Sequence, residues 1–264
     1  MTDSGGQATD WQRWLRVVAR ALYAIAIPLL IISTAVRVLF STQAVYTYAI
    51  DHYHAAEVTG ISRDDLIAAT EDIRAYFTDN QDYLRTLVHD QNGDVVPLFN
   101  TREVLHMHDV KQVVRFFYGL QTWSLLVVAT YSVAIVLWAG EESLADLARR
   151  TLRAVLATIV LLVLFGVVAA AGGFDAAFVT FHQIVFHNDY WRLDPTRDHL
   201  VQMFPEGFWL DATVLLCLLI ALEALTLGGV AWLYLRRHPA RAGTPPETPR
   251  PSPVDDERQP LRSR

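Results

Sequence analysis

FYGLQTWSLLVVATYSVAIVLWA, residues 117–139, is one of four stretches of sequence that decide the fold, and it contains no charged residue. A helix needs about 20 mainly apolar residues to cross the hydrocarbon core of a bilayer. Three further stretches of similar length, 17–40, 152–171 and 212–235, are also largely apolar. The sequence therefore predicts a mostly α membrane protein with four transmembrane helices.

The composition agrees with a membrane protein and excludes several other classes. Hydrophobic residues make up 52% of the chain and charged residues only 19%. The formal net charge of -6 argues against a nucleic-acid partner, which would require a basic surface. Cys217 is the single cysteine, so neither an intrachain disulfide nor a cysteine zinc site can form.

Three clusters of arginine flank the apolar stretches and predict the orientation in the membrane. They are Arg13, Arg16 and Arg20; Arg149, Arg150 and Arg153; and Arg236, Arg237 and Arg241. Arginine is enriched on the cytoplasmic side, so we expect both termini there. The cytoplasmic segments would be 1–16, 140–151 and 236–264, and the extracytoplasmic segments 41–116 and 172–211. Eight of the nine histidines lie in those two extracytoplasmic segments.

The segment 41–116 is long enough for a small α+β cap. Thr59-Gly60-Ile61-Ser62 is typical of a turn and helix cap before an amphipathic helix that ends near Thr78. Asn92-Gly93 between two short β-prone runs predicts a hairpin. A further helix should begin at Thr101, capped by Asn100 or Thr101, and continue into the second span. The Pro-rich tail from residue 238 is expected to be disordered.

Two histidine-bearing stretches indicate the chemistry. They are EVLHMHDVK at 103–111 and FHQIVFHNDYW at 181–191, and a short helix should carry the histidines of the second. Histidine changes its protonation state near neutral pH, so paired histidines at a lipid–water boundary suggest proton transfer on a lipid-borne substrate. A metal site is the main alternative, but no His-Glu-x-x-His spacing occurs. No Gly-x-Ser-x-Gly nucleophile motif occurs either.

Several charged residues could assist at such a site. Arg37, near the outer end of the first span, could hold a phosphate or an ester carbonyl. Arg102 and Lys111 could bind lipid phosphates or could be solvated surface charges. Asp109 or Asp189 could orient an imidazole ring.

A family resemblance rests on these same residues. The chain contains Glu103-x-x-His106-Met107-x-Asp109-Val110-Lys111 and Phe181-His182-x-x-x-Phe186-x-Asn188-x-x-Trp191-x-Leu193-Asp194-Pro195, followed by Met203-Phe204-Pro205-Glu206-x-Phe208. This pattern resembles the Lit family of lipoprotein intramolecular transacylases, which are four-helix bacterial membrane proteins. The resemblance covers about residues 21–232, and the long Pro-rich tail departs from it.

The resemblance implies an enzyme that acts outside the bacterial cytoplasmic membrane and needs no metal; we also expect no cofactor and a monomeric protein. Such an enzyme moves the sn-2 acyl chain of a diacylglyceryl lipoprotein to the α-amino group of its N-terminal cysteine, giving a lyso-form lipoprotein. The substrate and membrane lipid would be its partners. The two functional histidines of the family match His106 and His182. The residues expected to bind or orient the substrate are Arg37, Asp109, Lys111, Asn188, Asp189 and Trp191.

The implied reaction suits histidine. An α-amine has a pKa of about 7.7–8, so it must lose a proton before it can attack an ester. One histidine could be the base, while the other protonates the departing glyceryl oxygen or stabilises the oxyanion. The sequence leaves the assignment of these roles open. Rival functions are a non-enzymatic membrane protein whose cap binds a lipid or a partner, and a metal-dependent membrane hydrolase.

The orientation can be tested by cysteine accessibility labelling. Single cysteines placed at Asn92 and at Thr196, in a Cys217→Ala background, should react with an impermeant thiol reagent on intact cells. A cysteine placed at Arg241 should react only after the membrane is permeabilised. The opposite pattern would reverse the topology and remove the extracytoplasmic substrate.

Overall fold

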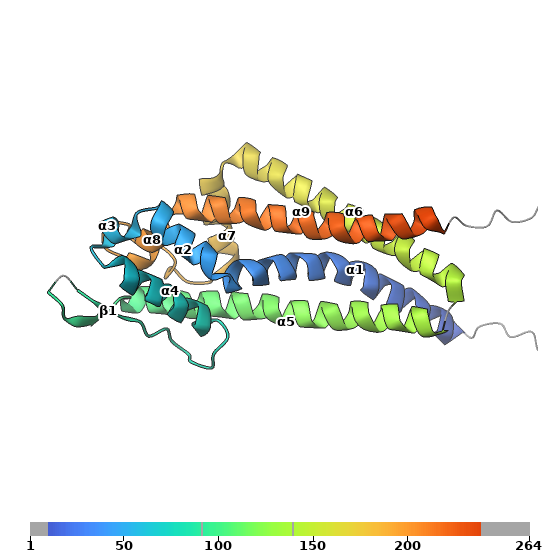
Figure 1. Cartoon of the computed structure of the whole chain (residues 1–264), viewed down its shortest axis with the longest axis horizontal. Helices are drawn as coiled ribbons and strands as arrows, with labels where there is room; N and C mark the ends of the chain where they lie inside the picture. The colour runs from blue at the N-terminus through green and yellow to red at the C-terminus, as the bar shows by residue number, and fades with distance from the viewer. Residues whose placement is uncertain (1–9, 91, 139, 239–264) are drawn as a thin grey trace, which may run out of the picture.

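Four long helices run side by side along the molecule (Figure 1). The structure is a computed structural model that describes residues 10–90, 92–138 and 140–238. Helix α1 (Asp10–Ser41) packs mainly against α5 (Thr101–Trp138), and α6 (Gly140–Gly172) packs mainly against α9 (Glu206–Arg237). Within the described residues, these four are the helices long and apolar enough to cross a membrane. The predicted fold class is confirmed.

The helices extend beyond the apolar stretches from which they were predicted. The expected loop 140–151 is instead the first part of α6, because its Leu, Ala and Arg residues are strong helix formers. Helix α1 begins at Asp10, inside the expected N-terminal segment. Residues 239–264 of the tail that was expected to be disordered lie outside the described part of the chain.

The first segment between the spans folds into three short helices and a hairpin. These are α2 (Gln43–His52), α3 (Ala55–Thr59), α4 (Arg63–Tyr76), and the strands β1 (Leu87–His89) and β2 (Val95–Pro97). The strands pair antiparallel, with Val88 opposite Val96. The Ser62 hydroxyl caps α4 by accepting a hydrogen bond from the Asp65 backbone N–H at 3.1 Å. The predicted helix and hairpin are both confirmed.

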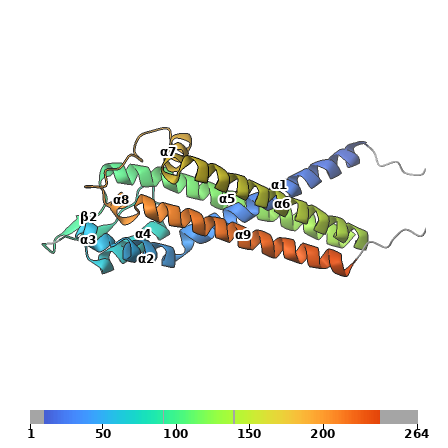
Figure 2. The same cartoon turned by 90° about the horizontal axis from the view of Figure 1, so that it is seen from above.

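The second segment completes the same cap. It contains α7 (Phe174–Val185) and α8 (His199–Met203), which lie at the cap end of the bundle (Figure 2). Side chains from both segments share one buried core, as Leu66 and Tyr76 do with Met203, Phe204 and Phe208. The two segments therefore fold as one unit, although α5 and α6 lie between them in the chain.

A second core lies between the long helices and includes Tyr23, Ile27, Val155 and Ala224. The outward faces of these helices carry exposed leucines and valines. The start of α1, the end of α5, the start of α6 and the end of α9 all lie at the end of the molecule opposite the cap (Figure 1). That end carries the described members of the three arginine clusters.

Lys111 joins the cap to α5. Its side chain is only 2% exposed, and its ammonium group donates to Asp79 Oδ1 and to the Gln81 carbonyl, each at 2.7 Å. The ammonium also lies 3.9 Å from the centre of the Tyr76 ring. We expected Lys111 to bind or orient substrate. The structure instead makes it a framework residue, because the preceding connection from α4 to β1 folds over it.

This framework role can be tested by thermal unfolding of the detergent-solubilised protein. Lys111→Met should lower the free energy of unfolding by roughly 2 kcal/mol, because the Asp79 carboxylate and the Gln81 carbonyl lose their charged donor. Arg63→Met is the matched control, since it breaks the exposed ion pair of Arg63 with Asp51 and should change little. Equal effects of the two substitutions would contradict a structural role for Lys111.

Candidate functional site

The start of α5 is set by a capping box. The Asn100 side-chain oxygen accepts hydrogen bonds from the backbone N–H groups of Arg102 (2.9 Å) and Glu103 (3.2 Å). Glu103 Oε2 in return accepts from the Asn100 backbone N–H at 2.8 Å. These bonds satisfy donors that a helix start leaves open. Asn100 is thus the cap, one of the two residues predicted, and the helix register that places His106 follows from it.

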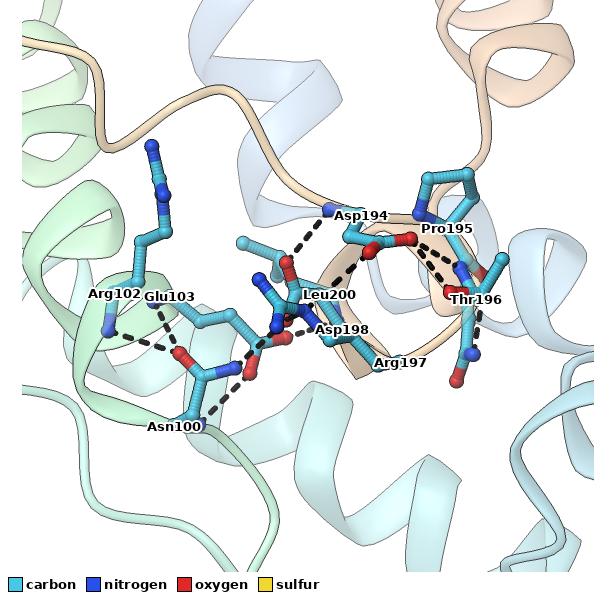
Figure 3. A network of polar contacts seen from close by, with 10 residues as sticks. Asn100, Arg102, Glu103, Asp194, Pro195, Thr196, Arg197, Asp198 and Leu200 are labelled. Atoms are coloured by element: carbon cyan, nitrogen blue, oxygen red, sulfur yellow. Dashed lines mark hydrogen bonds and ion pairs between the residues drawn. The ribbon is translucent and has the colours of Figure 1, made fainter.

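Two buried carboxylates connect this helix start to the segment before α8 (Figure 3). Glu103, 1% exposed, accepts from the Leu200 backbone N–H at 2.6 Å. Asp198, 2% exposed, accepts from the Asn100 side chain at 2.9 Å and from the Asp194 backbone N–H at 2.7 Å. Burial raises the pKa of Glu103, although the hydrogen bonds from the backbone N–H groups of Leu200 and Asn100 oppose this shift.

His106 on α5 and His182 on α7 face each other. Their ring centres are 6.0 Å apart, and each residue is 8% exposed. Phe186 lies 5.2 Å from the His106 ring and 5.5 Å from that of His182. Trp191 lies 5.0 Å and Phe178 4.3 Å from the His182 ring. The structure thus brings the two motif histidines together inside an aromatic enclosure.

The two imidazoles differ in their hydrogen bonds. His182 Nδ1 is 2.7 Å from the Phe178 carbonyl oxygen. A carbonyl can only accept, so this nitrogen carries the proton and the neutral ring keeps a lone pair on Nε2. Among the described residues, the buried Nδ1 of His106 has no hydrogen-bond partner. No hydrogen bond at this nitrogen therefore fixes the tautomer of His106.

Burial determines the charge of both rings. It lowers the pKa of His106 to about 4; His182 contributes in the same direction, and Asp109 opposes both. Burial also lowers the pKa of His182, against the effect of the Phe178 carbonyl. Both residues lie outside the apolar spans: His106 precedes the span that begins at Phe117, and His182 follows the span 152–171. At neutral pH both rings are uncharged, which is the state that can accept a proton.

The acidic residues expected near the site occupy different places. Asp109 accepts a hydrogen bond from the Asn188 side chain at 2.8 Å, so this pair joins α5 to the loop after α7 beside the histidines. Asp189 is exposed and pairs with Arg192 at 3.1 Å. Its backbone carbonyl accepts from Arg102 at 2.6 Å. Asp109 is therefore the carboxylate whose charge acts on the pKa of His106.

Arg37 is not brought to the histidine pair. Its guanidinium donates to Gln121 at 3.1 Å and lies 4.8 Å from the centre of the Tyr118 ring. Tyr118 is about 18 Å further along α5 than His106, at the usual rise of about 1.5 Å per residue. Arg37 therefore remains a candidate for contact with the lipid part of a substrate, away from the reacting atoms.

The other two motif histidines lie outside the enclosure. His108 Nδ1 is 2.7 Å from the Asp82 carbonyl, and its ring lies 5.3 Å from Tyr83 in the cap. His187 is exposed. The expected short helix carrying both Phe186 and His187 is wrong, because α7 ends at Val185 and Phe186 is extended (φ −110°, ψ 128°). This turn directs Phe186 back onto the histidine pair.

A sequence model of the lipoprotein intramolecular transacylase family, Lit, matches residues 21–209, which is well over half of the chain. The chain belongs to the Lit family. An uncharacterized protein of Aquifex aeolicus strain VF5 is 28% identical over 126 residues, 46% of this chain and 50% of that protein. The chain thus spans about half the length of the curated relative it matches.

Solved structures of the Lit family share the fold. The membrane-integral lipoprotein intramolecular transacylase Lit from Bacillus cereus is 19% identical, with a TM-score of 0.66 over 86% of this chain and 98% of that one. A variant of that protein, with a histidine replaced by alanine, has a TM-score of 0.67 at 18% identity over 88% and 98%. At these identities the similarity establishes the fold of an integral membrane protein.

Sequence reasoning assigned no role to Phe178, Phe186 and Glu103, which help to build this site, and assigned a different role to Arg102. Phe186 was visible within the quoted motif, and the Asn100-x-x-Glu103 spacing was a readable capping signal. Arg102, treated as a phosphate ligand or a surface charge, is half-buried and holds the loop after α7 through the Asp189 carbonyl. Phe178 acts through its backbone, for which no sequence signal exists.

The uncharged state of His106 can be tested by NMR of histidine-labelled protein in micelles. Its imidazole should titrate near pH 4, well below the usual value of about 6.5, because burial disfavours the charged ring. The His106→Ala variant identifies the resonance. Asp109→Asn should lower this pKa further, because it removes a charge that favours protonation. Asp64→Asn, in an exposed part of the cap, should leave it unchanged. A pKa at or above the usual value would refute the buried assignment.

Proposed function

We propose that the chain is a lipoprotein intramolecular transacylase, acting as a monomer on the extracytoplasmic face of the bacterial cell membrane. It would move the sn-2 acyl chain of a diacylglyceryl-cysteine lipoprotein to the α-amino group of the same cysteine. The observation that supports this most is the buried pair His106 and His182, 6.0 Å apart, in a member of the Lit family. The product is a lyso-form lipoprotein.

The reaction is an isomerisation. The amine nitrogen attacks the ester carbonyl carbon and forms the new C–N bond. The bond from that carbon to the sn-2 oxygen then breaks, and the glyceryl oxygen takes up the proton that the nitrogen loses. Because the amine and the ester belong to one molecule, the enzyme supplies mainly orientation and proton transfer. No water, acyl donor or metal enters the balance.

His182 is assigned as the base. Its Nδ1–H donates to the Phe178 carbonyl, which orients the ring and leaves the Nε2 lone pair to take the proton from the amine. The same nitrogen can then return this proton to the departing glyceryl oxygen.

His106 is assigned to stabilise the carbonyl oxygen of the ester. With a pKa of about 4 it is a weak base, but the neutral ring carries one N–H that can donate to the carbonyl oxygen as negative charge develops there. Its buried Nδ1 has no partner among the described residues, so no hydrogen bond at that nitrogen fixes which ring nitrogen carries the proton. Asp109, held by Asn188, would favour the orientation of this ring.

The surroundings of the pair suit a lipid-borne substrate. Helix α7 exposes Phe181 and Ile184, which are three positions apart and share one face, and Ile184 has 73% of its surface accessible. An amphipathic helix with such a face lies in the membrane interface. His182, on the opposite side of α7, would then meet an ester at the level of the lipid glycerol. The low polarity of the enclosure also strengthens each hydrogen bond formed in it.

The test uses a diacylglyceryl-cysteine peptide and purified enzyme in the presence of a chelator. Wild-type enzyme should give a product of identical mass, with one acyl chain moved from oxygen to nitrogen. His106→Ala and His182→Ala should each lower the rate by about 10²–10⁴, whereas His108→Ala and His187→Ala should retain activity. Release of a fatty acid to water would indicate a hydrolase, and activity only without chelator would indicate a metal enzyme.

The two roles are separated by glutamine, whose amide can donate a hydrogen bond but cannot serve as a base. His106→Gln should therefore recover part of the activity that His106→Ala loses. His182→Gln should be no more active than His182→Ala. Recovery by glutamine at 182 instead of 106 would exchange the two assignments, while leaving the transacylase reaction itself intact.

A further inference from the structure

An open cavity of about 350 Å³ lies between the start of α5 and the loop after α7. One wall is formed by Thr101, Arg102 and Leu105, and the other by Asp189 and Tyr190. Its volume falls in the range of about 300–1,000 Å³ that is usual for sites of small ligands. The catalytic scheme above uses none of its side chains.

The cavity adjoins the histidine pair on the side away from the apolar spans. Arg102 precedes His106 by four residues, so both lie on one face of α5, about 6 Å apart along the axis. The facing loop also leads from the histidine pair to the cavity. Asn188 binds Asp109 beside His106, and Asp189 and Tyr190 follow Asn188 directly in the chain. Any molecule that extends from the histidine pair toward water along this face passes the cavity.

The proposed substrate has such an extension. Its acyl chains remain in lipid, its amine and ester lie at the histidine pair, and its peptide must leave toward water. We propose that this cavity binds the first residues of the lipoprotein peptide that follow the lipidated cysteine. The proposal rests on the proposed function and adds to it the residues that select the peptide: Thr101, Arg102, Leu105 and Tyr190.

The walls of the cavity suit a short extended peptide. Arg102 Nη2 is held by the Asp189 carbonyl at 2.6 Å, so the guanidinium is already oriented before substrate arrives. Its remaining donors can bind peptide carbonyl oxygens, since arginine offers five N–H groups. Its buried Nε has no partner within the described residues. Leu105 and the Tyr190 ring, which is 40% exposed, offer an apolar wall for a side chain.

The opposite charges at the rim favour a peptide over a free anion. The charged residues that line the cavity are Arg102 and Asp189, so its lining carries one charge of each sign, and Asp189 also pairs with Arg192 at 3.1 Å. A phosphate or carboxylate would meet the Asp189 side chain as well as Arg102. A peptide backbone is neutral and offers both donors and acceptors, which matches a rim of mixed polarity.

The experiment compares two substrates with the same lipid: a diacylglyceryl-cysteinyl peptide and the diacylglyceryl-cysteine N-methylamide, which lacks the peptide. In wild-type enzyme, kcat/KM should be about tenfold higher for the peptide substrate, as expected from one or two hydrogen bonds and a small apolar contact. This ratio should fall close to one in Tyr190→Ala, which removes a wall, and in Thr101→Trp, which fills the cavity. Tyr83→Ala, an exposed tyrosine elsewhere in the cap, should leave the ratio unchanged.

Equal loss for both substrates in Tyr190→Ala and Thr101→Trp would show a structural role and overturn the proposal. A wild-type ratio of one would overturn it as well. A binding measurement separates this failure from failure of the proposed function. The His182→Ala enzyme should bind the peptide-bearing lipid about tenfold more tightly than the N-methylamide. If wild-type enzyme converts neither lipid, the transacylase assignment is wrong, and the Kd ratio still decides whether the peptide is bound.

Discussion

Two buried carboxylates, Glu103 and Asp198, require hydrogen-bond donors, and this requirement fixes how the segments of the cap are arranged. A buried charge without partners costs several kcal/mol, so these side chains hold whichever segments supply the donors. The donors are the backbone N–H groups of Leu200 and Asp194 and the side chain of Asn100. Asn100 lies about a hundred residues before the other two in the chain. Through them the first turn of α5 is fixed against the second outer segment, and His106 faces α7.

Burial then gives the histidine pair its chemistry. An aromatic enclosure keeps both rings uncharged, which suits a reaction that only passes a proton from nitrogen to oxygen within one substrate. The proposed roles follow the order of groups along one face of α5: Arg102 for the peptide, His106 for the ester, and Asp109 to orient the ring. The apolar side chains exposed on α7 extend this order into the lipid. One helix face would thus match a substrate that is peptide at one end and lipid at the other.

Local patterns in the sequence were sufficient for the framework. Apolar length predicts the four long helices, and the Asn92-Gly93 pair predicts the hairpin. The helix start at Asn100 and Thr101 was also predictable, because capping depends on residues three positions apart. His106 and His182 stood out by residue type and by position beside the spans. Each of these inferences needs only neighbouring residues, so no knowledge of tertiary contacts was required.

The sequence by itself determined which segments span the membrane and which histidines lie beside them. Only the tertiary structure decided what these side chains meet. Lys111 reads as a lipid-facing cation, yet the loop carrying Asp79 covers it. Phe186 reads as helical, yet the chain turns at that point onto the histidine pair. The fixed tautomer of His182, the pairing of Asp109 with Asn188 and the cavity at Arg102 likewise depend on packing or backbone geometry. The contacts of Lys111 with Asp79 and of Asp109 with Asn188 join residues 32 and 79 positions apart, and periodicity or spacing carries no information about them.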